Sequence, residues 1–138
     1  MRSLRVAIAL TLLALPACAV YDAVKDLVTL STAISKEFGS QADVNVSAGK
    51  RLTVTLKNSD AANLPAADRE HFARLVALFA VAHYPKIDSV DTVAVGFKSE
   101  RGALGVKVTT SSTPYAWTVR ELRAMADSLP ASPDSTKK

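Results

Sequence analysis

Few side chains in this 138-residue sequence could take part in covalent or metal chemistry. The chain has one cysteine, Cys18, and two histidines, His71 and His83. The histidines stand twelve residues apart in a helix-like stretch. They would lie about 120° apart around its axis, so they cannot face one metal ion. The sequence patterns of zinc proteases, nucleophile elbows and phosphate-binding loops do not occur. We therefore predict no metal site, no cofactor and no catalytic residue.

Cys18 follows a segment whose layout is typical of a bacterial secretory signal. Residues 1–5 include two arginines, residues 6–15 are almost wholly apolar, and the small residues Ala17 and Ala19 flank the cysteine. A basic start, a short apolar run and a zone of small residues can engage a translocon. The run is about half of the roughly 20 residues that a membrane-crossing helix needs. The segment therefore predicts export followed by cleavage.

The residues Leu15-Pro16-Ala17-Cys18 resemble the lipobox of bacterial lipoproteins. The resemblance covers the signal segment alone, and it implies cleavage after Ala17, a diacylglyceryl group on the Cys18 sulfur and an acyl chain such as palmitate on the new amino terminus. Two or three chains give a stable anchor, since each buried methylene contributes about 0.8 kcal/mol. Pro16 departs from the usual small or β-branched residue, so ordinary cleavage after Ala19 remains the alternative.

The residue after the cysteine also predicts a location within the cell envelope. Ala19 stands where an aspartate retains some bacterial lipoproteins at the inner membrane, so we expect the outer membrane or the periplasmic face. Without Arg2 and Arg5 the chain has 15 basic and 13 acidic side chains, and the basic ones are scattered. This charge pattern is poorly suited to nucleic acid. The expected partners are the membrane, through Cys18, and an envelope protein or glycan.

Apolar periodicity predicts the order α-ββ-α-ββ-α for the rest of the chain. This order indicates an α+β fold, with a mainly antiparallel four-stranded sheet and helices packed on one face. We expect a signal peptide over 1–17, a lipidated amino terminus and short linker over 18–21, one α+β domain over 22–129 and a disordered tail over 130–138. The first helix is expected over 22–38, and the turn of the second hairpin over 99–102.

Three apolar sets are expected to face the core. The first helix would present Val24, Leu27, Val28, Ser31, Ile34 and Phe38, and the long helix Phe72, Leu75, Val76, Phe79 and Ala80. In the second hairpin, Leu104, Val106 and Val108 would return on the face that carries Val93, Val95 and Phe97. The last helix begins with a capping box formed by Thr118 and Glu121.

One polar and aromatic segment is the candidate binding face. If the last strand continues, Ser111, Thr113, Tyr115 and Trp117 share one side and could bind a peptide or glycan. The alternative, which we favour, places Trp117 in the core under the last helix, because large aromatic side chains are mostly buried.

The sequence leaves two classes of function open. The first is a membrane-anchored lipoprotein that acts as a non-enzymatic binding or structural module, which predicts an exposed apolar patch or sheet edge. The second is a secreted or anchored hydrolase, or a small-ligand binder, with a nonstandard site. That class predicts a concave pocket with convergent polar groups and perturbed pKa values.

Overall fold

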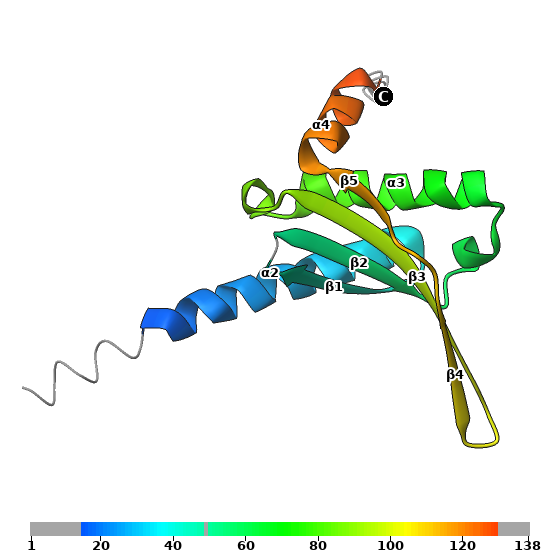
Figure 1. Cartoon of the computed structure of the whole chain (residues 1–138). Coiled ribbons are helices and arrows are strands. Elements are labelled where there is room, and N and C mark those ends of the chain that lie inside the picture. The colour runs from blue at the N-terminus through cyan, green and yellow to red at the C-terminus, as the bar shows by residue number, and fades with distance from the viewer. Residues whose placement is uncertain (1–14, 49, 130–138) are drawn as a thin grey trace, which may run out of the picture.

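The computed structural model describes residues 15–48 and 50–129 (Figure 1). Most of the predicted signal and the predicted tail over 130–138 lie outside these residues. The fold is α+β, as predicted. Its elements are α2 (Leu15–Phe38), β1 (Gln41–Ser47), β2 (Arg51–Lys57), a 3-10 turn (Asp60–Asn63), α3 (Ala66–His83), a second 3-10 turn (Ile87–Ser89), β3 (Thr92–Ala103), β4 (Val106–Ser111), β5 (Tyr115–Thr118) and α4 (Val119–Ser128).

The described sheet has five strands, where the sequence predicts four. The order is β1-β2-β3-β4, and β5 also pairs with β3. The added strand arises because the segment 112–114 interrupts the strand that returns along β3 and divides it into β4 and β5. Pro114 cannot donate a backbone hydrogen bond, and Ser112 bonds the backbone of Phe97 instead. Three of the four strand pairings are antiparallel, and β2 lies parallel to β3, which follows α3 in the chain.

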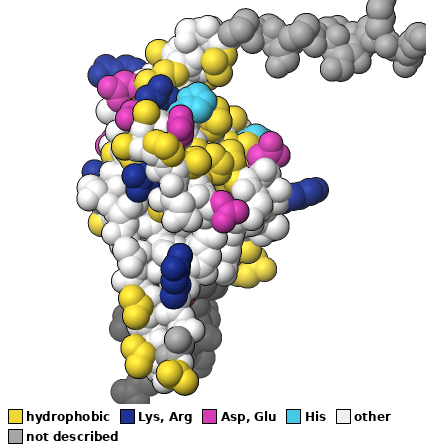
Figure 2. Space-filling view, turned by 90° about the vertical axis from the view of Figure 1, so that its right-hand side faces the viewer, with side chains coloured by type: hydrophobic (Ala, Val, Ile, Leu, Met, Phe, Trp, Pro, Cys, Tyr) yellow, Lys and Arg dark blue, Asp and Glu magenta, His cyan; other side chains and the backbone are white. Residues whose placement is uncertain are grey.

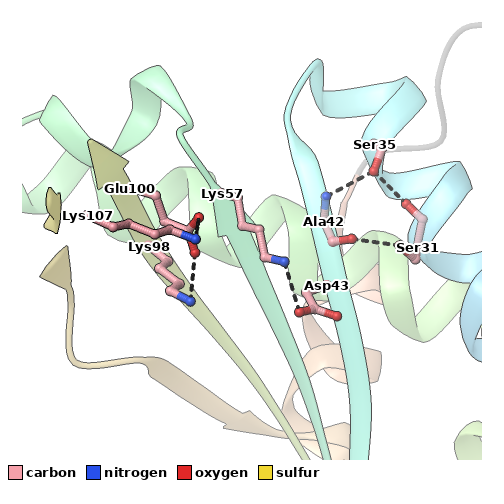
Figure 3. Close-up of polar contacts among 8 residues, drawn as sticks. All are labelled: Ser31, Ser35, Ala42, Asp43, Lys57, Lys98, Glu100 and Lys107. Atoms are coloured by element: carbon pink, nitrogen blue, oxygen red, sulfur yellow. Dashed lines mark hydrogen bonds and ion pairs between the residues drawn. The ribbon is translucent and has the colours of Figure 1, made fainter. Parts of the chain in front are cut away.

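Helices α2 and α3 pack on one face of this sheet, as predicted. That face supplies the fully buried side chains Leu52, Val54, Leu56, Val93 and Val95. The opposite face carries threonines and charged side chains, among them Asp43, Lys57 and Lys98 (Figure 3). One apolar face and one polar face explain why the strands alternate so regularly in the sequence.

The side of α2 that enters the core is only partly the predicted one. Leu30 and Ile34 are buried, and Leu27 and Phe38 pack against the core as predicted, whereas Val24 and Val28 are more than half exposed. At about 100° per residue the two exposed valines lie on a different side of the helix from Leu30 and Ile34. The helix also begins seven residues before the predicted start at Asp22.

The predicted buried side of α3 is confirmed for Val76 and Ala80, and Phe72 and Phe79 pack against the core. Its centre also includes the small residues Ala73 and Ala77, and only Leu75 of the predicted set lies outside it. Ala73, Val76, Ala77 and Ala80 are fully buried, while Leu75 is 42% exposed. Small side chains at a contact allow two elements to lie close together, so the larger apolar residues of α3 move to the flanks.

Helix α4 packs against α3 and β5. It begins with the predicted capping box: the Thr118 hydroxyl accepts a bond from the backbone N–H of Glu121, and the Glu121 carboxylate accepts one from the backbone N–H of Thr118. The hydrogen bonds that the carboxylate accepts from the backbone N–H and the hydroxyl of Thr118 lower the pKa of Glu121. Leu122, one turn into the helix, is fully buried.

Candidate functional site

The distal parts of β3 and β4 project from the layered body as an arm (Figure 1). Strand β2 pairs with β3 only as far as Lys98, so beyond that residue β3 pairs with β4 alone. Asn58 stabilises the base of the arm. Its backbone N–H donates to the carbonyl of Lys98 at 2.8 Å, and its Oδ1 accepts from the backbone N–H of Glu100 at 2.8 Å.

The arm ends in a two-residue turn, Leu104-Gly105, and not at the predicted 99–102. Residues 99–102 lie within the ladder, where Ser99 pairs with Thr110 and Gly102 with Lys107. Leu104 and Gly105 have φ values of +52° and +80°, as a type I′ hairpin turn requires. The prediction selected the wrong glycine, because a leucine is not the residue that normally precedes the glycine of such a turn.

The free end of the arm is apolar and exposed. Leu104 is 103% exposed, Val106 64% and Val108 58%, and Figure 2 shows apolar side chains at this end. The sequence analysis placed these residues in the core. Val106 and Val108 do lie on the side that continues the helix-covered face, since Val108 pairs with Arg101. The arm extends beyond the helices, however, so nothing in the described chain covers them (Figure 1).

The other side of the arm carries a charged cluster at its base. The two carboxylate oxygens of Glu100 lie 2.9 Å from the Lys98 Nζ and 2.8 Å from the Lys107 Nζ (Figure 3). Hydrogen bonds from these two ammonium groups lower the pKa of Glu100 to about 2. The carboxylate is therefore ionised at neutral pH, with both oxygens engaged.

A hollow of about 470 Å³ lies beside this cluster. Its lining includes Asn58, Glu100 and Lys107 as well as the turn residues Leu104 and Gly105. The convergent polar groups and the perturbed pKa are the features that the hydrolase or ligand-binder hypothesis predicts. The pKa shift arises, however, from two ion pairs that keep the carboxylate charged, and an ionised carboxylate held by two lysines is poorly suited to accept or donate a proton near neutral pH.

The candidate binding face from the sequence is not brought together on one side of the sheet. Ser111 pairs with Lys98 on the polar face. Tyr115 and Trp117 pair with Val95 and Val93, and their half-buried rings pack against the core, with ring centroids 6.3 Å apart. Thr113 lies exposed in the interruption between β4 and β5. Because of the interruption, the residues after it face the opposite side of the sheet from the one that the alternation up to Ser111 predicts, and the sequence pattern did not show this change.

A second exposed surface lies where α2 runs along β1, the outer strand of the sheet. The Ser31 hydroxyl donates to the carbonyl of Ala42 at 2.7 Å, and the backbone N–H of Ala42 donates to the Ser35 hydroxyl at 3.0 Å (Figure 3). These bonds satisfy the backbone N–H and carbonyl of Ala42 at the edge of β1. Beyond it a hollow of about 230 Å³ opens, lined by Val24, Leu27, Val28, Ser31, Thr32, Asp43 and Val44.

The histidines of the sequence analysis lie on α3 and are both exposed. The His83 ring stacks on Phe79 with centroids 3.9 Å apart, and its Nδ1 lies 2.9 Å from the Phe79 carbonyl oxygen. Over residues 15–48 and 50–129, no group of three or more His, Cys, Asp or Glu side chains could hold a metal ion.

Ala17 and Cys18 lie in the first turns of α2. Within the described part of the chain, no helix combines the length and the apolar character that crossing a bilayer requires. Comparison with known proteins finds no matching family model, no matching curated protein and no matching solved structure.

Proposed function

We propose that this protein is a lipoprotein of the bacterial cell envelope, anchored through Cys18, that acts as a non-enzymatic binding module. The anchor is inferred from the basic start, the apolar run and the Leu-Pro-Ala-Cys residues that precede the domain. We place the protein at the outer membrane or the periplasmic face, because Ala19 follows the cysteine.

The observation that carries the binding role is Leu104. Its backbone adopts the left-handed conformation, which costs a non-glycine residue roughly 1–2 kcal/mol. Its side chain is 103% exposed, so burial within the domain does not offset that cost. An apolar side chain held in an unfavourable conformation at the end of an arm is better explained by contact with a partner than by folding.

The shape and charge of the arm indicate the kind of partner. Leu104, Val106 and Val108 give an apolar contact, and Arg101, which pairs with Val108, adds a positive charge on the same side of the arm. An envelope protein with an apolar pocket bordered by acidic groups would complement both features.

Two measurements test this proposal. For the anchor, the intact mass of the protein purified from membranes should correspond to a chain that begins at Cys18 and carries diacylglyceryl and acyl groups. Cys18→Ser should remove the lipid mass. A wild-type product that begins at Val20 would contradict the anchor.

For the arm, a photo-crosslinking amino acid is placed at Val106 or, as a matched control, at Thr109. Both positions are exposed on β4, but Thr109 pairs with Glu100 and lies on the charged side. We expect one discrete adduct from position 106, weakened by Leu104→Asn, and none from position 109. Equal adducts from both positions would contradict a specific apolar contact.

A further inference from the structure

The amino-terminal half of α2 carries an exposed apolar stripe that the arm does not explain. The stripe consists of Val20, Tyr21, Val24 and Val28, each more than half exposed. Valines at positions 20, 24 and 28 follow one side of a helix. They lie on the side that continues through Ser31 and Ser35 towards the edge of β1.

Charges are separated around this helix. Lys25 borders the stripe, about 40° beyond Tyr21, whereas Lys36 lies about 12 Å beyond Val28 along the helix axis. The acidic side chains Asp22 and Asp26 lie on the far side, and Asp26 is held by Lys86 of the body at 3.1 Å. The stripe therefore has one basic neighbour on α2 and is remote from the acidic groups of that helix. Asp43 of β1 lies beside Val24 and Val28, and its carboxylate is paired with Lys57 at 3.2 Å.

The stripe begins next to the proposed anchor. Val20 lies about 3 Å and Val28 about 15 Å along the helix axis from Cys18. Cys18 lies within the same helix, so an acyl chain on it would hold the stripe close to the membrane.

We propose that the amino-terminal half of α2 lies on an anionic lipid bilayer, with Val20, Tyr21, Val24 and Val28 in the membrane interface. This inference rests on the proposed anchor at Cys18. An exposed apolar stripe with Lys25 at its border is typical of an interfacial helix: the apolar side chains enter the interface, and the lysine reaches the anionic head groups. Tyr21 adds an aromatic ring with a polar tip, which favours the same depth.

The test places a single new cysteine on either side of α2. A Cys18 whose sulfur carries diacylglyceryl as a thioether has no free thiol, so a maleimide carrying an environment-sensitive fluorophore reacts only with the new residue. Val24→Cys places the label on the stripe. Asp22→Cys is the control, because Asp22 is nearer to Cys18 yet lies about 160° around the helix from Val24.

The full-length expression product is purified from membranes and reconstituted in vesicles of phosphatidylethanolamine and phosphatidylglycerol that contain nitroxide-labelled lipid. We expect a blue-shifted, strongly quenched label at position 24 and a weakly quenched label at position 22. High salt should reduce the difference between them, because it screens the attraction of Lys25 to the anionic head groups. Equal quenching at both positions, or stronger quenching at position 22, overturns the inference.

Other occupants of the stripe give different results. Disulfide-linked dimers of Val24→Cys, or a shielded but unquenched label, would assign the stripe to a second copy or to an envelope protein and would overturn the bilayer contact. The intact mass of the wild-type protein, together with its maleimide uptake, separates this inference from the anchor. If the protein begins at Val20 or takes up the maleimide at Cys18, the anchor itself fails; if its mass shows a lipid-bearing Cys18 and position 24 remains unquenched, only the bilayer contact fails.

Discussion

Replacing Leu104 by asparagine should stabilise the arm. Asparagine visits the left-handed conformation at lower cost than leucine, and it is the preferred residue before glycine in a type I′ turn. Leu104 has a φ of +52° and a fully exposed side chain, so the substitution relieves backbone strain without a loss of buried surface. We estimate a gain of about 1 kcal/mol in the stability of the turn.

This gain should be measured locally, because the arm can open while the body stays folded. Native-state hydrogen exchange reports such local opening residue by residue. A gain of about 1 kcal/mol corresponds to roughly fivefold slower exchange. We expect this slowing at the amides near Gly102 and Lys107, which pair next to the turn. The fully buried core strands, such as Val54 in β2, should not change.

Leu104→Ala is the matched control for the stability of the turn. Alanine removes the apolar side chain but retains the cost of the left-handed backbone, so exchange should stay near the wild-type rate. Both variants should weaken the proposed partner contact. If asparagine and alanine give the same exchange rates, the argument from backbone strain is wrong. If neither substitution changes the crosslink from position 106, Leu104 has no role in binding.

Three further predictions concern the stability of the domain. Thr118→Ala should lower the free energy of unfolding in urea by about 1 kcal/mol, because the first turn of α4 loses its cap. Leu122→Ala should cost about 2–5 kcal/mol, since the side chain is fully buried, whereas Leu129→Ala at an exposed position should have little effect. In an NMR titration the Glu100 carboxyl should have a midpoint pKa near 2, and Lys107→Ala should raise it. Because this pKa is lowered by folding, the stabilisation is complete above the unfolded value and is lost as the pH falls towards 2, so acid unfolding of the arm should begin in this range.

The sequence alone determined the elements whose signals are local. The first hairpin follows from strict alternation, and its strands β1 and β2 pair over Gln41–Ser47 and Arg51–Lys57. The capping box at Thr118 depends on two residues three positions apart, so the start of α4 could be predicted and was found. The lipid anchor at Cys18 is a local signal too, and it stays a prediction.

Tertiary structure decided what each apolar side chain faces. Val106 and Leu52 look alike in an alternating sequence, but Leu52 lies under the helices and Val106 lies on an arm that extends beyond them. Likewise Val24 and Ile34 both fit a helical period, yet the width and direction of the buried side depend on where the sheet and α3 lie. Periodicity specifies that an element has an apolar side, whereas burial also requires a neighbour at that side. The apolar end of the arm, and Val24 and Val28 of the α2 stripe, are residues that the sequence predicted in the core and that the described fold leaves exposed.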